Sequence, residues 1–437
     1  MSLKPAKVTK KKEPKEELQK PKGTRDLLGS EVLYLDGFIE KASEIAMYYG
    51  FSAIITPTFE KESLFTRSIG DGTDIIDKEM YVLRTKGGDK LALRPEGTAP
   101  VMRAYFENGL NSKPQPVMLY YAGSYFRHER PQRGRLRELR QFGIEIIGTS
   151  KSIADALTIH LLTIILKEVG IKNYTVSINS IGDKDSQIVY KRELSNYYRK
   201  HLKSICADCR VRLKNNPLRV LDCKNEKCDL IKAEAPETLS FLSNDSKRHF
   251  KEVLEYLDKL SIPYTINTTL VRGLDYYSHT VFEIIPEAKD GEEALSVAGG
   301  GRYDYLGKQL SGKKDVPGMG GAIGIDRLLE TPGYNFPCPR IVKKPKIFFI
   351  QLSYEAKLIS LTVTEILRKA KIPVAQSLSK DSLGAQLGKA ERLGVPYVII
   401  LGQKEALDET VIIRNMDTRS QDTVKINDLT NFIKKIK

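Results

Sequence analysis

The stretch FRHERPQRGRLRELRQFGIE, residues 126–145, contains an arginine-rich loop between two long strand-like runs. We predict strands over 117–127 and 137–147, and the second run shows the alternation with a period of two that is typical of β-strands. Glycine and proline in the loop interrupt both runs and favour a turn between them. The stretch therefore predicts a pair of long strands joined by a basic loop.

The second of these strands has two different faces, because alternate side chains point to opposite sides of a strand. The apolar face carries Phe142, Ile144 and Ile146. The polar face carries Gln141 and Glu145, with Gly143 between them. A polar face with a glycine gap is typical of a pocket floor on which a flat ligand lies. A solvent-exposed sheet face is the alternative.

The segments before this pair favour hairpins and helices over alternating βαβ units. The patterns predict a helix over 30–49, strands over 51–56, 79–85 and 90–94, and a helix over 98–106. Ser30 is a candidate N-cap of the first helix and Gly50 a candidate left-handed stop. Gly87-Gly88-Asp89 favours a hairpin. We therefore expect the α+β class, an antiparallel sheet flanked by helices.

The middle of the chain changes character. A helix over 150–169 and a strand over 174–180 are followed by residues 183–262, which are charged, helical in pattern and hold four of the five cysteines. We interpret 183–262 as an insertion. Strand-like runs then return at 266–272, 280–285 and 296–298, and 320–330 runs from a glycine-rich strand into a helix.

A proline-rich linker over 331–343 separates this first domain, 23–330, from a second domain over 344–437. In the second domain, predicted strands alternate with predicted helices: strands over 346–352, 397–401 and 409–415, and helices over 356–370, 383–393 and 430–436. This order indicates a small α/β domain with a mixed sheet.

Composition excludes several classes of protein. The chain has 437 residues, 41% of them hydrophobic, and no apolar run approaches the ~18 residues that cross a bilayer. The N-terminus is lysine-rich with no apolar segment behind it, so we expect neither a secretory signal nor a membrane partner. Five cysteines fit a reducing compartment, and we expect a cytoplasmic protein.

The net charge of +15 is unevenly placed, because residues 1–22 carry +5 and residues 344–437 carry +6. The residues between these two segments are nearly balanced in charge. Basic ends on such a chain favour a polyanionic partner that extends beyond a central pocket. The alternative is a solvated surface with a lysine-rich tail. Residues 1–22 lack aromatic side chains, and we predict that this tail is disordered.

No phosphate-loop signature occurs in the sequence, so a nucleotide would be held mainly by arginines. Besides the 126–135 loop, three segments place arginine close to glycine: LRPEGT (93–98), VRGLDYY (271–277) and GGAIGIDR (320–327). Turn and packing chemistry is an adequate explanation of each segment alone. Together they favour a phosphate-handling pocket on an antiparallel sheet.

Taken in order, these segments resemble those of the histidyl-tRNA synthetases, which are class II aminoacyl-tRNA synthetases. KGTRD (22–26) matches the N-terminal signature of that family. Three stretches match the class motifs: 51–60 with Pro57 is motif 1, 126–129 with its loop and 141–145 is motif 2, and 320–327 is motif 3. VRGLDYY (271–277) and AGGGRY (298–303) match the two histidine-specific stretches. The resemblance implies that 23–330 is the catalytic domain and 344–437 the anticodon-binding domain. It also implies a homodimer, with motif 1 at the interface.

The resemblance implies two reactions, in which histidine and ATP give histidyl-adenylate and pyrophosphate, and the histidyl group then passes to the 3′ end of histidine tRNA. Arg127 and Arg272 would be catalytic, at the α-phosphate. The implied ATP-binding residues are Arg127, Glu129, Arg135 and Arg327, acting with Mg²⁺. The implied histidine-binding residues are Glu96, Gly97, Thr98, Gln141, Glu145, Arg272, Tyr276 and Tyr277. We expect no DNA partner.

Two alternatives share parts of this pattern. A synthetase-like regulatory subunit of histidine biosynthesis would lack the anticodon-binding domain and the intact motifs. Another class II synthetase, of the threonyl or prolyl type, would share motifs 2 and 3 and lack the 271–277 stretch. The amino acid that is activated distinguishes all three.

Four cysteines fall within the insertion, as Cys206-x-x-Cys209 and, after thirteen intervening residues, Cys223 and Cys228. Paired cysteines at such spacing are typical of a Cys₄ zinc site. Reduced thiols in a helical insertion are the alternative. The resemblance does not imply zinc, since catalysis in this family does not need it.

Overall fold

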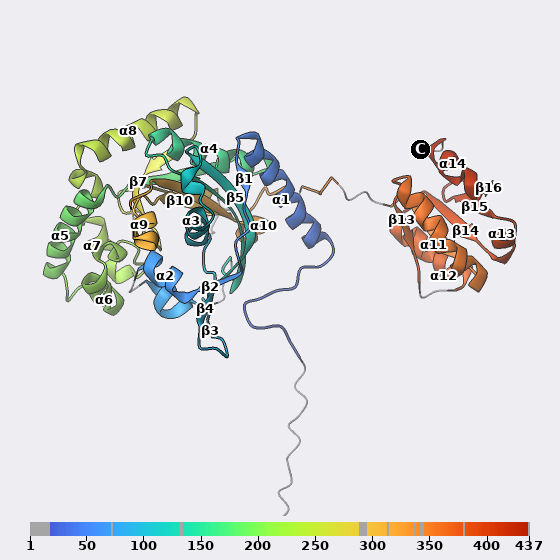
Figure 1. Ribbon diagram of the computed structural model, residues 1–437, viewed down its shortest axis with the longest axis horizontal. Coiled ribbons are helices and arrows are strands. Elements are labelled where there is room, and N and C mark those ends of the chain that lie inside the picture. Colours follow the sequence, from blue (N-terminus) through green and yellow to red (C-terminus); the bar gives the residue numbers. More distant parts are fainter. Residues whose placement is uncertain are drawn as a thin grey trace, which may run out of the picture. The chain divides into compact units, whose positions relative to one another are not determined.

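The computed structural model describes residues 18–70, 73–130, 134–287, 295–312, 314–335, 337–340, 345–378 and 381–435 (Figure 1). The chain divides into two compact units, Met1–Pro339 and Arg340–Lys437, and each is described by itself. Most of the predicted tail over 1–22 lies outside the described residues, as do 336 and 341–343 of the predicted linker.

Eight strands form the main sheet of the first unit, in the order β1-β5-β6-β11-β10-β9-β7-β8. Their bounds are β1 Ser52–Ala53, β5 Val117–Phe126, β6 Glu138–Ile147, β7 Tyr174–Ser180, β8 Tyr264–Ile266, β9 Ser278–Pro286, β10 Ala298–Arg302 and β11 Gly318–Gly324. The five inner pairings are antiparallel, and the two outer pairings, β1–β5 and β7–β8, are parallel. The predicted antiparallel sheet is confirmed.

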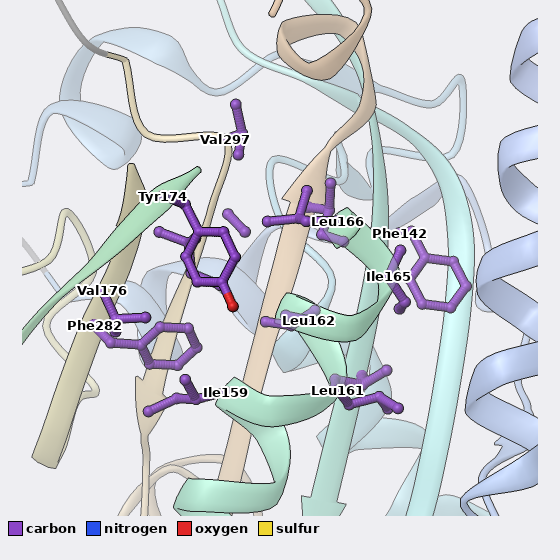
Figure 2. Packing of buried hydrophobic residues seen from close by; sticks show 14 of the residues in the cluster. Phe142, Ile159, Leu161, Leu162, Ile165, Leu166, Tyr174, Val176, Phe282 and Val297 are labelled. Carbon is purple, nitrogen blue, oxygen red and sulfur yellow. The ribbon is translucent and has the colours of Figure 1, made fainter. Parts of the chain in front are cut away.

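One face of this sheet is covered by α1 (Ser30–Tyr48), α4 (Ser152–Glu168) and α8 (Asn244–Lys259). The apolar face predicted for β6 lies in this core, since Phe142, Ile144 and Ile146 are buried. In Figure 2, Leu162 of α4 lies between Phe142 of β6 and Phe282 of β9. Burial of a leucine or phenylalanine contributes roughly 1.5–3 kcal/mol, so this apolar layer anchors the sheet.

The other face is covered by α3 (Thr98–Glu107) and α9 (Leu306–Ser311), which pack on tyrosines of the sheet. A three-stranded sheet in the order β2-β4-β3 adjoins α2 (Glu62–Ile69) and α3. Its strands are β2 Phe59–Lys61, β3 Val82–Arg84 and β4 Lys90–Leu93. The hairpin predicted at Gly87-Gly88-Asp89 joins β3 and β4.

The predicted insertion is helical and has a core of its own. It holds α5 (Lys184–Lys200), α6 (Ala207–Asn215), the 3-10 turn Pro217–Val220, α7 (Asp229–Ala233) and α8. Cys209, Cys223 and Cys228 lie in its core together with Leu213 and Leu218.

The second unit is a mixed five-stranded sheet in the order β13-β12-β14-β15-β16, with helices α11 to α14. The strands are β12 Ile347–Gln351, β13 Val374–Gln376, β14 Tyr397–Leu401, β15 Thr410–Asn415 and β16 Gln421–Lys425. The helices are α11 Tyr354–Lys369, α12 Leu383–Leu393, α13 Gln403–Leu407 and α14 Leu429–Lys435. Both faces are buried, since Phe348 and Phe349 lie in separate cores. The predicted mixed α/β domain is confirmed.

Four predicted elements were wrong in extent. The strand over 51–56 is reduced to β1, and the strand over 79–85 begins at Val82 because Glu79 ends the π-helix Ile75–Glu79. The strand over 296–298 corresponds to β10, which begins only at Ala298. The run over 266–272 leaves the sheet after Ile266 because the Asn267 side chain accepts hydrogen bonds from the Thr269 amide and hydroxyl, which turns the chain.

Two details concern ends of elements. Ser30 does not cap α1: Gly29 occupies the N-cap position and no side-chain cap is formed. Gly50 has φ +85°, as predicted for a left-handed stop. No helix among the described residues combines the length and the apolar character needed to cross a bilayer.

Candidate active site

A cavity of about 150 Å³ opens where β6, β10 and β11 present small or polar residues. It brings together arginines from separate parts of the chain. The charged residues that line it are Arg127, Arg135, Arg140, Arg272 and Arg327, with Glu129, Glu283 and Asp326. Five guanidinium groups against three carboxylates leave a surplus of positive charge, which favours an anionic ligand.

The polar face predicted for β6 forms part of the floor, since Gln141 lines the cavity. Gly324 of β11 lies opposite Gln141 in the sheet, and Ala322 and Gly299 also line the cavity. A Cβ on Gly299 would lie 2.7 Å from Nη1 of Arg272, so glycine is needed for the guanidinium to lie against the backbone.

The gap predicted at Gly143 is already filled, and this part of the interpretation was wrong. Tyr121, which pairs with Gly143 across β5 and β6, lays its ring over the glycine. A Cβ on Gly143 would lie 2.3 Å from the Tyr121 ring, and one on Gly97 would lie 2.6 Å from it. The two glycines therefore make room for a tyrosine, and the open floor lies further along the strand at Gln141.

Glu145 is the buried end of the polar face and is 1% exposed. Its Oε1 accepts hydrogen bonds from Thr98 Oγ1 (2.8 Å) and the Tyr121 hydroxyl (2.9 Å), and its Oε2 accepts one from the Tyr303 hydroxyl (2.6 Å). Burial raises the pKa of Glu145 to about 7 despite these bonds, and the Glu96 charge adds to the shift. The three donors are neutral hydroxyls, so they do not offset the charge of the ionised carboxylate. A cationic ligand group would do so.

Glu96 lies next to Glu145, at the start of α3. Its carboxylate accepts hydrogen bonds from the backbone amides of Thr98 (2.7 Å) and Ala99 (2.9 Å), which are free donors at a helix N-terminus. The Tyr276 hydroxyl donates a third, of 3.1 Å. Burial raises the pKa of Glu96 in spite of these bonds. The two buried carboxyls share a wall of tyrosines that includes Tyr276 and Tyr303.

Arg272 reaches the cavity from the 271–277 segment and forms an ion pair with Glu283 of β9. Burial lowers the pKa of Arg272, but Glu283 and Tyr277 more than offset this, so the pKa is raised and the charge is kept. Its Nε is buried and has no hydrogen-bond partner among the described residues. A buried donor without a partner calls for an explanation, and an anionic ligand in this cavity would supply one.

The 126–135 loop contributes a second group of cations. Glu129 lies 3.2 Å from Nη1 of Arg135 and 3.9 Å from Nη1 of Arg127. Arg327 at α10 (Ile325–Leu329) donates to the carbonyls of Gly134 (2.9 Å) and Ser296 (3.0 Å). Burial lowers the pKa of Arg327, and the nearby Arg135 lowers it further. Such a clustering of like charge is relieved when an anion binds.

Sequence reasoning missed several residues of this site. Asp326 bonds the backbone amide of Arg140 (2.6 Å) and lies 2.7 Å from Nη2 of Arg25, so it ties the N-terminal signature to β6. Glu283 and Tyr121 were also missed. Asp326 stands inside the 320–327 segment and could have been singled out there, whereas Glu283 and Tyr121 lie on strands with no local signal.

Pro57 is exposed and lies apart from this cavity, beside the exposed apolar side chains of Ile55 and Phe59. It lines a separate hollow with Glu60 and Arg103, which form an ion pair.

The four insertion cysteines come together, with their sulfur atoms all within 4.8 Å of one another, and could hold a metal ion. The fifth, Cys338, is exposed and lies outside this cluster.

The antiparallel sheet, the arginine-walled cavity beside buried carboxyls and the separate α/β unit agree with the class II aminoacyl-tRNA synthetase architecture that the resemblance implies. Comparisons with known proteins identify the family. A family model described as histidyl-tRNA synthetase matches residues 23–328, and one described as an anticodon binding domain matches residues 346–436.

Individual relatives agree with the family models. A histidine--tRNA ligase of Dehalococcoides mccartyi is 41% identical over 95% of this chain and 99% of its own length. A histidine--tRNA ligase of Fervidobacterium nodosum is 42% identical over 92% of this chain and 95% of its own length. The crystal structure of the apo histidyl-tRNA synthetase of S. aureus superposes with a TM-score of 0.77 at 31% identity, over 96% of this chain and 100% of that one.

The chain belongs to the histidyl-tRNA synthetase family, a family of histidine--tRNA ligases. A Bacillus halodurans structure titled as an ATP phosphoribosyltransferase regulatory subunit/histidyl-tRNA synthetase is 22% identical, with a TM-score of 0.62, and shares the fold alone. The predicted family, fold class and enzyme class are therefore confirmed. The roles of individual residues stay predictions.

Proposed function

We propose that this chain carries out both steps of the histidine--tRNA ligase reaction in the cavity described above. The observation that carries this proposal is the surplus of arginine over carboxylate in one cavity, next to the buried pair Glu96 and Glu145. A triphosphate requires the cations, and the ammonium group of an amino acid requires the carboxylates.

In the first step, a carboxylate oxygen of histidine forms a bond to the α-phosphorus of ATP. The bond from that phosphorus to the bridging oxygen breaks, and pyrophosphate leaves. Such a displacement needs alignment and fixed positive charge, and it needs no nucleophile from the protein. We assign Arg127 and Arg272 to the α-phosphate as the catalytic residues.

We assign Arg135 and Arg327 to the β- and γ-phosphates. Glu129 supports this group, because it lies 3.2 Å from Arg135 and fixes where that guanidinium points. Arg327 is held by two backbone carbonyls, which leaves its positive charge uncompensated for phosphate oxygens.

Histidine would lie between this cation group and the buried carboxyls. Glu96, Thr98, Gln141 and Glu145 would bind its ammonium group, and Tyr276 and Tyr277 would line the imidazole pocket. Gly97 would contribute to the histidine site by making room for the Tyr121 ring. The Thr98 hydroxyl already donates to Glu145 at 2.8 Å, so both residues face the same space. Polar groups that must pair with a ligand reject isosteres strongly, since the wrong ligand leaves them unpaired.

Mg²⁺ is the expected companion of ATP. Glu129 and Glu283 both line the cavity, and Mg²⁺ in such sites takes one or two carboxylates together with phosphate oxygens. We assign these two residues to Mg²⁺. Because Glu129 also pairs with Arg135 and Glu283 with Arg272, they would hold the ion together with phosphate oxygens and would not form a cage of their own. A bound Mg²⁺ would neutralise negative charge on the departing pyrophosphate.

In the second step, a hydroxyl of the terminal adenosine of histidine tRNA attacks the adenylate carbonyl, and AMP leaves. We assign the second unit to the recognition of the anticodon, in line with the family model that matches 346–436. Residues 344–437 carry +6, which suits contacts with tRNA phosphates. We propose no role for DNA.

We also propose a cytoplasmic homodimer. Ile55 is 92% exposed and Phe59 54% exposed on the segment that contains Pro57, and a second copy of the chain would cover these side chains. The catalytic domain of the proposal spans 23–330 with its insertion at 183–262. The linker spans 331–343, and the anticodon-binding domain spans 344–437.

ATP–pyrophosphate exchange with each of the twenty amino acids in turn tests the proposed first step. Exchange with histidine alone is the expected result. Exchange with another amino acid would keep the class of reaction and overturn the histidine pocket. No exchange with any amino acid, from a folded protein, would favour a regulatory subunit and refute the proposed activity.

A further inference from the structure

The four thiols of the insertion lie close enough together for one tetrahedral metal ion to bind all of them. The sulfurs of Cys206 and Cys223 are 3.8 Å apart, and those of Cys228 and Cys209 are 4.0 Å apart. A tetrahedral ion with Zn–S bonds of about 2.3 Å places its sulfur ligands about 3.8 Å from one another. All four sulfurs lie within 4.8 Å of one another, so one ion can reach every one of them.

Backbone amides are directed at three of these sulfurs. The amide of Cys206 donates to Cys228 (3.2 Å), that of Cys209 to Cys206 (3.4 Å), and that of Asn225 to Cys223 (3.4 Å). Thiols are weak acceptors, whereas thiolates attract such donors strongly. Three backbone amides are therefore placed where they would stabilise thiolate ligands of a metal ion.

The surrounding charge also suits an anionic cluster. A Zn²⁺ ion with four thiolates carries two negative charges, and residues 203–232 contain eight lysines and arginines against four aspartates and glutamates. Cys209, Cys223 and Cys228 are buried in the core of the insertion. Soft thiolate ligands in tetrahedral arrangement select zinc over magnesium or calcium.

The chain between the two cysteine pairs reaches the active site. The 3-10 turn Pro217–Val220 lies between Cys209 and Cys223, and Arg219 in this turn is 6% exposed. Nη1 of Arg219 donates a hydrogen bond of 3.0 Å to the backbone carbonyl of Arg272. Val271, one residue earlier, packs against the core that contains the cysteines. The cysteine cluster and the Arg272 backbone are thus joined by one side chain.

We propose that Cys206, Cys209, Cys223 and Cys228 bind one Zn²⁺ ion, and that this site holds Arg219 in place as a positioning residue for Arg272. Zinc binding displaces a proton from each thiol. Because Cys209 and Cys223 stand on either side of the turn that carries Arg219, an ion bound to both closes this loop. Arg219 makes no contact with substrate in this proposal and acts through the Arg272 backbone. The part that concerns Arg272 rests on the proposed function, whereas the zinc site does not.

Metal content tests the site independently of activity. The full chain, reduced and reconstituted with zinc and then freed of excess metal, is analysed beside Cys209→Ser, Cys228→Ser and the control Cys338→Ser. We expect about one zinc per chain in the wild type and in Cys338→Ser, and little in the other two. Zinc well below one per chain in folded wild type would overturn the site.

Cobalt provides a second readout that does not depend on whether the serine variants fold. Wild-type chain reconstituted with Co²⁺ should show the thiolate-to-metal charge-transfer band and the d–d bands of tetrahedral cobalt. Titration with Zn²⁺ should remove these bands. A spectrum of octahedral cobalt, or four thiols that stay reactive in the presence of Zn²⁺, would refute the Cys₄ assignment.

The positioning role is tested with Arg219→Gln, Arg219→Lys and the control Arg210→Gln, an exposed arginine of the same insertion. We expect zinc content to stay near one per chain in all three. In Arg219→Gln the kcat of histidine-dependent exchange should fall about tenfold or more, because small misplacements of a catalytic group are costly. Arg219→Lys should recover part of the loss, and Arg210→Gln should match the wild type. An unchanged kcat in zinc-loaded Arg219→Gln would overturn the role of Arg219 and leave the zinc site standing.

Discussion

Arg272 and Glu283 form an ion pair, with the guanidinium lying over Gly299 of β10, which is the register partner of Glu283. The pairing is not evident from the sequence, because Arg272 stands on the 271–277 segment and Glu283 stands on β9. The pair keeps Arg272 charged and oriented in a half-buried wall, where an unpaired cation would be costly. An α-phosphate oxygen would meet a guanidinium that is already oriented, with its Nε still free of partners among the described residues.

Arg272→Ala should therefore abolish adenylate formation and leave the protein folded. Loss of a preorganised charge at the reacting phosphate costs about 10²–10³-fold in rate, and we expect histidine-dependent ATP–pyrophosphate exchange to fall by at least that factor. Arg368→Ala is the matched control, because Arg368 is exposed on α11 and pairs only with Glu365 among its described ion pairs. Near-normal exchange by folded Arg272→Ala would remove Arg272 from the mechanism.

Much of the sheet could be predicted because its signals are local. The alternation along β6 placed Phe142 in the core and Gln141 on the cavity floor from sequence alone. Arginines close to glycines in the 126–135 loop and the 320–327 segment indicated a phosphate-handling pocket, and this signal is also local in the sequence. These features depend on neighbours in the chain, and the periodicity of a strand carries them directly.

The parts that could not be predicted depend on pairing between distant strands. Tyr121 covers Gly143 only because β5 and β6 pair in that register, so the glycine looked like an open gap. Glu283 reaches Arg272 only because β9 lies next to β10. Sheet register and the order of strands are set by the whole core, and a single strand's sequence does not contain them.

Arg327→Ala should weaken the binding of ATP more than that of histidine. Arg327 bonds two backbone carbonyls, and the nearby Arg135 holds its pKa down, so a triphosphate would relieve the repulsion. We expect the KM for ATP to rise about tenfold or more, since a charged hydrogen bond contributes roughly 1.5–3 kcal/mol. Exchange kinetics with each substrate varied in turn measure this. Equal increases in both KM values would contradict the assignment to phosphate.

The affinity for histidine should increase as pH rises through about 7. The pKa of Glu145 is raised to about 7, so this carboxyl is largely neutral below that pH and ionised above it. The ionised form attracts an ammonium group, and the KM for histidine should therefore fall as the pH increases. Histidine itself titrates in this range, so the ratio of the wild-type KM to that of Glu145→Gln at each pH isolates the protein's contribution. A ratio that does not vary with pH would refute the role of Glu145.

Removal of residues 340–437 should separate the two steps of the reaction. The first unit, Met1–Pro339, has its own cores and contains every residue assigned to histidine and ATP. The truncated chain should therefore keep ATP–pyrophosphate exchange within about twofold, while its kcat/KM for charging tRNA falls at least about tenfold through lost phosphate contacts. In the intact chain the KM for tRNA should rise with added salt, because those contacts release counterions, and the truncated chain should show a weaker dependence. Retained exchange shows that the first unit is folded, so a failure of charging cannot come from unfolding. Unchanged charging by the truncated chain would refute the assignment of the second unit to tRNA.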